Sequence, residues 1–254
     1  MTKMNKHFQL AKNRIRPYYS RIRRFGFSRK CPICKSSLSR FLPFGVSNIR
    51  DDVLCPVCGS LERHRLIAMF FKNQRDRLFN KKSRRFLHIA PEASIRKIVK
   101  RIGKVDYLSL DLNSKSVSIR GDLTSLCFPD KSIDMFYCSH VLEHIPADTM
   151  AMKEIRRILK DDGWAILQVP LDENRESTFE DPTIVSEDDR LRVFGHPDHV
   201  RIYGTDYAKR LKEAGFIVER IDFAKQFSHG EKIRYGFGNN PEKIHFCQPN
   251  NNPD

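Results

Sequence analysis

The stretch FLHIAPEASIRKIVKRIGKVDYLSLDL, residues 86–112, decides the fold class of this chain. It starts with the apolar run FLHIAP (86–91), continues at helical spacing over 93–103, and returns to an apolar run over 105–112. A buried strand, a helix and a second buried strand in this order form a βαβ unit, which requires a parallel sheet. The stretch therefore predicts an α/β protein.

The same alternation continues toward the C-terminus. Further apolar runs cover 116–123, 132–139, 164–171, 216–223 and 243–249, and helical patterns cover 148–160 and 205–215. Gly215 follows the last helical pattern, as a helix stop does. We expect a Rossmann-like doubly wound sheet over residues 86–249. Such sheets bind ligands outside the carboxyl ends of their strands, where the strand order reverses.

Two CxxC pairs lie upstream of this region. Cys31 and Cys34 are separated from Cys55 and Cys58 by a 20-residue spacer, a spacing that suits one tetrahedral zinc with four thiolate ligands. Gly59 suits the tight turn after the second pair. A four-cysteine set leaves no open coordination position, so we expect a structural zinc knuckle over 31–62. Unrelated buried cysteines, or a disulfide pair, are the less favoured alternatives.

Composition restricts the class of protein. A chain of 254 residues with a hydrophobic fraction of 40% holds one α/β domain and a small module. No run approaches the roughly 18 apolar residues of a membrane span, and the N-terminus lacks the apolar region of a signal peptide. Cys127, Cys138 and Cys247 are expected to be small core residues in a reducing compartment, so we expect a cytoplasmic protein.

The formal net charge of +15 is concentrated in part at the N-terminus, because residues 1–30 carry ten Lys or Arg and no Asp or Glu. This basic arm could contact RNA or another polyanion; a solvated arm without a dedicated partner is the alternative. Apolar residues at helical spacing then predict a connecting helix over 61–79, followed by a polar linker. The expected organisation is an arm (1–30), a knuckle (31–62), a connecting segment (63–85) and a sheet domain (86–249).

Acidic side chains close two of the apolar runs. Asp111 ends the run at 105–112, where a carboxylate can accept hydrogen bonds from both hydroxyls of a ribose; an exposed loop aspartate is the alternative. Asp122 closes the next run, and Leu123 beside it offers an apolar wall for an adenine ring. The alternative for Asp122 is a turn or helix-cap residue.

Histidines gather in the segment RVFGHPDHVRIYGTD (192–206). His196, Asp198 and His199 fall within four residues, in an expected insertion over the carboxyl edge of the sheet. We interpret them as a base or acceptor clamp; a structured lid with purely structural histidines is the alternative. A divalent metal at this trio is less favoured, because two histidines so close on one loop seldom converge unaided.

The segments GDLTSLCFPDKSIDMFYCSHVLEHI (121–145) and EIRRILKDDGWAILQVP (154–170) resemble class I S-adenosylmethionine-dependent methyltransferases of the methyltransferase type 11 group. The resemblance covers about residues 86–225, and the cysteine knuckle resembles that of a smaller bacterial branch of the group. It implies a seven-stranded Rossmann-like sheet with an antiparallel last strand. It also implies S-adenosylmethionine as the cofactor, lying across the carboxyl edge.

Particular residues follow from this resemblance. It implies that Asp111 contacts the ribose and that Asp122 with Leu123 borders the adenine. Ser139 and His140 would face the methionine part and the transferable methyl group. His144, on the same turn as His140, is more typical of a structural residue.

The first loop departs from the family pattern. The family's first strand ends in an acid followed by a glycine-rich loop, and here His88 replaces the acid while Ala90 and Glu92 replace the first two glycines. Ala90 is small enough to keep the backbone close to a cofactor. Glu92 could take over the contact with the cofactor's amino group, or it could repel the cofactor's carboxylate.

Two functions stay open at this point. The first is a methyltransferase in which His199, His196 and His140 are the candidate catalytic residues, since an acceptor of high pKa needs a base. A small-molecule or saccharide acceptor is favoured over RNA, because no run after residue 85 combines Lys or Arg with stacking aromatic residues. The second is a non-catalytic binding module with a degenerate methyltransferase fold, contacting nucleic acid or protein.

Overall fold

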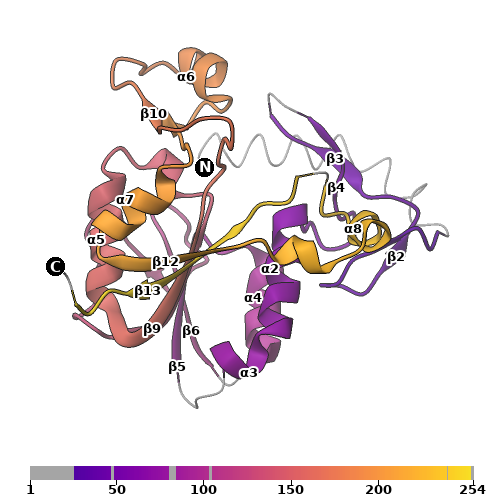
Figure 1. The fold of residues 1–254 in the computed structure, drawn as a ribbon, viewed down its shortest axis with the longest axis horizontal. Helices are drawn as coiled ribbons and strands as arrows, with labels where there is room; N and C mark the ends of the chain where they lie inside the picture. Colours follow the sequence, from indigo (N-terminus) through magenta and orange to yellow (C-terminus); the bar gives the residue numbers. More distant parts are fainter. Residues whose placement is uncertain (1–25, 47–48, 80–83, 103–104, 239, 253–254) are drawn as a thin grey trace.

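A seven-stranded mixed sheet forms the centre of the molecule (Figure 1). The computed structural model describes residues 26–46, 49–79, 84–102, 105–238 and 240–252. In spatial order the strands are β12 (Phe216–Ile221), β13 (Ile244–Pro249), β9 (Leu159–Gln168), β8 (Ile133–Ser139), β5 (Arg84–Ile89), β6 (Val105–Asp111) and β7 (Ile119–Arg120). The ladders from β9 to β7 are parallel, and β13 is antiparallel to both neighbours. The predicted Rossmann-like α/β sheet with an antiparallel last strand is confirmed.

Helices cover both faces of the sheet (Figure 1). One face carries α2 (Glu62–Asn73), α3 (Arg75–Leu78) and α4 (Ala93–Ile102), and the other carries α5 (Asp148–Ile158) and α7 (Tyr207–Glu213). Because alternate residues of a strand point to opposite faces, β8 supplies both cores. Its Met135 and Tyr137 belong to one hydrophobic cluster, and Phe136 and Cys138 belong to the other.

Two details of the sheet differ from expectation. Cys138 and Cys247 are fully buried, but Cys127 is exposed, so its prediction as a core residue was wrong. It lies on the loop before β8, between the buried Leu126 and the half-buried Phe128, and its own side chain faces the surface. The apolar run at 116–123 contributes only the two-residue edge strand β7, because few of its side chains have a buried face to pack against.

The knuckle consists of two short hairpins. β1 (Arg29–Lys30) pairs with β2 (Ser37–Leu38), and β3 (Leu42–Phe44) pairs with β4 (Arg50–Leu54). The connecting helix predicted over 61–79 is found as α2 and α3. It covers the sheet, since Leu66, Phe70 and Phe71 belong to the same hydrophobic cluster as Trp164 of β9. The exact division into domains stays a prediction, and residues 1–25 of the basic arm lie outside the described residues.

The four knuckle cysteines converge on one point. Their Sγ atoms all lie within 4.8 Å of one another, with Cys31 to Cys58 at 3.6 Å and Cys34 to Cys55 at 3.8 Å. Zinc–sulfur bonds of about 2.3 Å in a tetrahedron place the sulfurs about 3.8 Å apart. The donor set therefore fits a structural zinc.

The two turns of the knuckle have the same backbone geometry. Lys35 and Gly59, each directly after the second cysteine of its pair, have φ values of 67° and 69°. Their amides donate to the carbonyls of Cys31 and Cys55, each at 2.9 Å. Gly59 is suited to this left-handed conformation, whereas Lys35 adopts it at a cost in strain.

Two further elements were not predicted from the sequence. A lid consists of β10 (Phe179–Glu180), α6 (Glu187–Phe194) and β11 (Arg201–Ile202), and α8 (His229–Tyr235) lies beside the knuckle (Figure 1). Both helices carry ordinary end signals: Ser186 and Ser228 cap their N-termini, and Gly195 and Gly236 end them with positive φ. Two 3₁₀ turns, η1 (Leu142–His144) and η2 (Phe223–Gln226), complete the fold. No helix in the described ranges is long and apolar enough to cross a membrane.

We predict that the cysteine pairs hold zinc. Cys31→Ser or Cys58→Ser should lower the zinc content of the purified protein by one equivalent per chain and destabilise the hairpins, because serine is a poor zinc ligand. The central sheet should stay folded. Zinc is measured by mass spectrometry of the metal and folding by circular dichroism. Cys127→Ser, the same change at an exposed cysteine, is the control, and unchanged zinc in the knuckle variants would refute the prediction.

We also predict an acid sensitivity that originates in the sheet. His245 in β13 is 3% exposed, and burial, aided by the charge of Arg220, lowers its pKa to about 4. The unfolded chain binds a proton there first, so stability falls as the pH drops below the unfolded value of about 6.5. When the pH is lowered from 7.5 to 5.5, the free energy of unfolding of the wild type should fall by about 1 kcal/mol more than that of His245→Phe, as measured by urea unfolding. Equal losses in both proteins would contradict the prediction.

Candidate functional site

Two residues at the carboxyl edge have strained backbones. β5 lies between β6 and β8, so the strand order reverses here. Ala90, directly after β5, has φ 44°, and His140, directly after β8, has φ 54°. Their amides donate to the carbonyls of Leu110 and Gln168 at 2.8 and 2.9 Å, which holds both turns. Left-handed non-glycine residues are uncommon and gather at functional sites.

A buried carboxylate links the first loop to helix α2. Glu92 Oε2 lies 2.7 Å from Nε2 of the fully buried His88, and Glu92 Oε1 lies 3.4 Å from Nε2 of His64. Burial alone would raise the pKa of Glu92, but its hydrogen bond with His88 and its contact with His64 hold the pKa well below its usual range. Tyr107 completes the set with its hydroxyl 2.9 Å from His88 Nδ1. Both carboxylate oxygens therefore face histidines.

The predicted nucleoside contacts lie on neighbouring strand ends. Asp111 is the last residue of β6, and its Oδ1 accepts the amides of Asn113 and Ser114 at 2.8 and 2.7 Å. Asp122 is exposed and accepts both the amide and the hydroxyl of Thr124, while Leu123 is buried. The predicted residues that end or directly follow parallel strands share this edge: His88, Ala90, Glu92, Asp111, Ser139 and His140.

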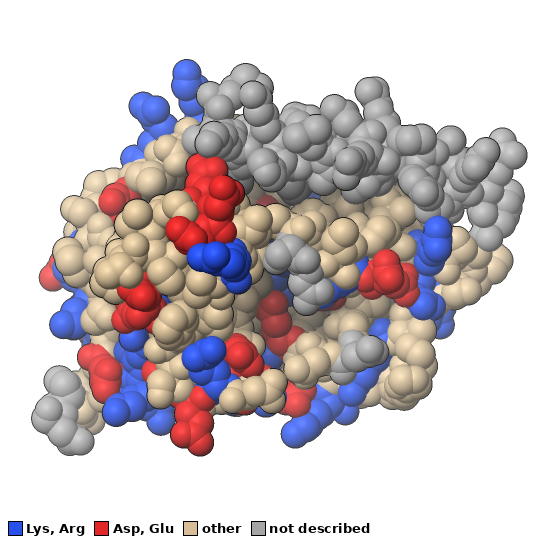
Figure 2. Space-filling model, turned by 90° about the horizontal axis from the view of Figure 1, so that it is seen from above, with Lys and Arg blue, Asp and Glu red and all other residues tan. Residues whose placement is uncertain are grey.

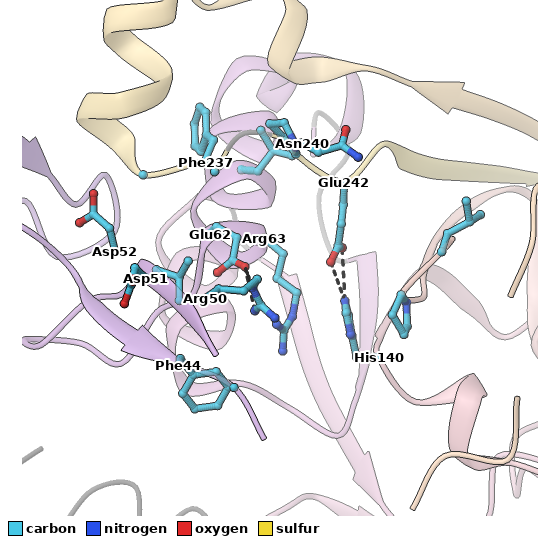
Figure 3. A pocket seen from close by; sticks show the side chains of 18 of the residues that line it. Phe44, Arg50, Asp51, Asp52, Glu62, Arg63, His140, Phe237, Asn240 and Glu242 are labelled. Atoms are coloured by element: carbon cyan, nitrogen blue, oxygen red, sulfur yellow. Dashed lines mark hydrogen bonds and ion pairs between the residues drawn. The ribbon is translucent and has the colours of Figure 1, made fainter. Parts of the chain in front are cut away.

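A cavity of about 1360 Å³ opens at this edge. Five parts of the chain line it: the knuckle, the start of α2, the lid with the turn after β8, the segment directly after β9, and α8 with the segment that follows it (Figure 3). Arg50 pairs with Glu62 on one side of it. In the space-filling view the molecule is hollowed in this region, and Lys and Arg are interspersed with Asp and Glu around the hollow (Figure 2).

His140 extends into this cavity and pairs with a residue far away in sequence. Its Nε2 lies 3.0 and 3.2 Å from the two carboxylate oxygens of Glu242 (Figure 3). Burial would raise the pKa of Glu242, but the charge and hydrogen bond of His140 lower it to about 2. His140 Nδ1 lies 3.6 Å from Glu143. The imidazole therefore sits between two carboxylates.

Three histidines converge on the lid side of the cavity. The ring centre of His199 lies 4.7 Å from the ring centres of both His144 and His196. The ring centres of His144 and His196 are 5.6 Å apart. Burial and the neighbouring charges of His144 and His196 lower the pKa of His199 to about 3. The predicted trio of His196, Asp198 and His199 does not form as expected. The backbone of Asp198 contacts the rings, and His144 supplies the third one.

Several buried polar atoms at this edge have no hydrogen-bond partner among the described residues. They are Arg63 Nε, Tyr137 Oη, Ser139 Oγ and both carboxylate oxygens of Glu143. The sequence analysis missed Arg63, Glu143 and Glu242, and it assigned His144 a structural role. The polar residues inside the strand-to-helix turn VLEHI were the available signal for Glu143 and His144. No local pattern indicates Glu242.

Comparison with known proteins agrees with this arrangement. Residues 86–167 match the family of methyltransferase domains. A chain of the complex between the Haloferax volcanii Trm112 methyltransferase activator and a candidate methyltransferase is 16% identical, with a TM-score of 0.51 over 76% of this chain and 92% of that one. S-adenosylmethionine-dependent methyltransferases from Mesorhizobium loti and Archaeoglobus fulgidus are 13% and 15% identical, each with a TM-score of 0.46. They are matched over 70% and 73% of this chain, and over 96% and 94% of theirs.

No curated protein matches the chain. The family match coincides with the part of the sheet that carries the strained turns and the strand-end residues. Residues 86–167 therefore match the methyltransferase domain family, within a chain that has the Rossmann-like fold of the class I S-adenosylmethionine-dependent methyltransferases and a four-cysteine knuckle before it.

Proposed function

We propose that this protein transfers a methyl group from S-adenosylmethionine to a small acceptor bound in the cavity at the carboxyl edge. The observation that supports it most directly is the pair of buried polar groups that line this cavity without hydrogen-bond partners among the described residues, on Arg63 and Glu143. Buried polar groups are normally satisfied, so such a pair calls for a polar ligand. A binding module without catalysis is less favoured, because the family match covers the strand ends themselves.

The nucleoside half of the cofactor fits the ends of β6 and β7. Two backbone amides hold Oδ1 of Asp111, so its carboxylate is fixed in orientation before a ligand arrives. We assign Asp111 to the ribose hydroxyls, and Asp122 with the buried Leu123 to the adenine. Ala90 already has the left-handed backbone that glycine usually supplies, which lets the chain pass close to the cofactor.

The methionine half of the cofactor would lie beside the first loop, whose sequence departs from the family pattern. Because Glu92 faces two histidines, its negative charge is largely compensated and repels a carboxylate less than a free glutamate would. We assign the cofactor's carboxylate to Arg63, whose Nε is buried without a partner among the described residues and which lines the cavity. Ser139 and His140 would lie beside the methyl group.

His140 is the residue we assign to proton removal. When its Nε2–H donates to Glu242, Nδ1 carries the lone pair that takes the acceptor's proton, and Glu242 together with Glu143, 3.6 Å from Nδ1, stabilises the resulting charge. S-adenosylmethionine supplies a methyl group on a positively charged sulfur. Holding the acceptor in line with that methyl group therefore contributes much of the rate, and removal of the acceptor's proton contributes the rest. His196 and His199 line the acceptor side of the same cavity.

The cavity favours a small acceptor over RNA. The face in Figure 2 shows charges of both signs around a hollow, and its described residues do not form one continuous basic surface. RNA binding requires such a surface and weakens steeply with salt. The acceptor's identity is therefore best sought among small molecules and saccharides, with titrations at two salt concentrations to separate them from polyanions.

The cofactor assignment predicts the effect of changing Asp111. Asp111→Ala should weaken S-adenosylmethionine binding by about 1–3 kcal/mol, because hydrogen bonds to a charged acceptor are lost. Calorimetric titration of the zinc-loaded protein measures it. Asp106→Ala, at the opposite end of β6 and exposed, is the matched control and should bind normally. A folded wild-type protein that fails to bind the cofactor would overturn the proposed function.

The assignment of His140 predicts a change in turnover. His140→Ala should lower kcat by roughly 10²–10⁴-fold, the usual contribution of a positioned base, with a much smaller effect on cofactor affinity. Glu242→Gln should give an intermediate loss. Release of S-adenosylhomocysteine with the first active acceptor measures both. His229→Ala, an exposed histidine at the cavity rim, is the control; equal losses in all three variants would count against a base at His140.

A further inference from the structure

We propose that His144, His196 and His199 form a second metal site, separate from the cysteine knuckle, which binds a divalent transition metal ion such as zinc. One candidate ligand atom from each histidine lies within 4.8 Å of the other two. Neutral imidazole nitrogens are ligands that zinc and similar ions prefer. The three rings line the cavity at its lid side.

The spacing suits a metal after a small contraction. Zinc–nitrogen bonds of about 2.0–2.1 Å in a tetrahedron place the nitrogens about 3.4 Å apart. His144 is already oriented for this purpose, because its Nδ1 donates to the backbone carbonyl of Asp198 at 3.1 Å. Metal-bound histidines almost always use their second nitrogen in this way, which directs the lone pair of Nε2 toward the ion.

A buried carboxylate lies beside the cluster, and its contacts with histidine nitrogens, including Nδ1 of His140 at 3.6 Å, are too long for hydrogen bonds. Glu143 is 1% exposed, and neither of its oxygens accepts a hydrogen bond from the described residues. Its Oε1 lies 3.9 Å from His144 Nε2 and 4.0 Å from His199 Nε2. An unpaired buried charge is costly. A metal ion among the three histidines would supply the missing positive charge, with Glu143 as its counter-ion.

The lid is fastened to the same turn that carries Glu143 and His144. Arg201, 3% exposed, donates from its guanidinium to the carbonyls of Leu142, Ile145 and Pro146 at 2.5–3.0 Å. The amide of Val200 also donates to the carbonyl of Glu143 at 3.0 Å. His196 and His199 are therefore held against η1 by contacts that do not involve their own rings, so the site is built before a metal binds.

This site would differ from the knuckle in having a coordination position that no protein ligand fills. Four thiolates saturate a zinc ion, whereas three histidines leave a position that faces the cavity. An oxygen donor entering the cavity could occupy that position. The metal site itself does not depend on the proposed methyl transfer, so its test needs no acceptor and no turnover.

The test counts metal ions on the full chain. Protein stripped with a chelator and dialysed against zinc should retain two equivalents per chain. The variant with His144→Ala, His196→Ala and His199→Ala should retain one, the variant with Cys31→Ser and Cys58→Ser should retain the other, and His229→Ala should retain both. Two zinc ions in the triple histidine variant, or one in the wild type, would overturn the proposal.

A spectroscopic measurement on the wild type covers the case in which the triple variant does not fold. Cobalt bound to thiolates shows strong sulfur-to-metal charge-transfer absorption, whereas cobalt bound to histidine shows only weak visible bands. Titration of the stripped wild type should give one equivalent with charge transfer and a second without it. A titration that ends after the first equivalent would mean that the histidines bind no metal and would overturn the proposal.

Discussion

The buried guanidinium of Arg65 holds the parts of this protein together. The residue is 0% exposed, and its guanidinium lies 3.9 Å from the ring centre of Phe41. Its nitrogens donate to four carbonyls, those of Val53, Ser60, Tyr235 and Gly236. A buried charge is tolerated only when every donor has a partner. One side chain on α2 therefore fixes the knuckle and the end of α8 to the layer that covers the sheet.

The shape of the cavity depends on these contacts of Arg65. The knuckle and the segment after α8 form two of its walls, and that segment carries Glu242 to His140. Gly236 leaves no room for variation, because a Cβ there would lie 2.5 Å from the Phe41 ring and 2.9 Å from an Arg65 nitrogen. The knuckle thus shapes the cavity, although none of its cysteines lines it.

Histidine–carboxylate pairs recur around the carboxyl edge. Glu92 faces His88 and His64, Glu242 faces His140, and Glu143 lies among several histidines at longer distances. Burying so many ionisable groups at one edge of a sheet costs stability unless they are paired. Their concentration where two strained turns meet is typical of a site that evolved for chemistry, since perturbed pKa values and strain both collect there.

The sequence by itself determined the elements whose signals are local. The βαβ alternation indicated the sheet, the CxxC spacing indicated the metal knuckle, and parallel strands bring their carboxyl ends, including Asp111, to one edge. Tertiary structure alone decided the rest: that His144 joins His196 and His199, that Glu242 reaches His140, and that Cys127 is exposed. The first two outcomes depend on how a lid and a C-terminal segment pack over the edge. Contacts between residues about 50 to 100 positions apart leave no periodicity or spacing in the sequence.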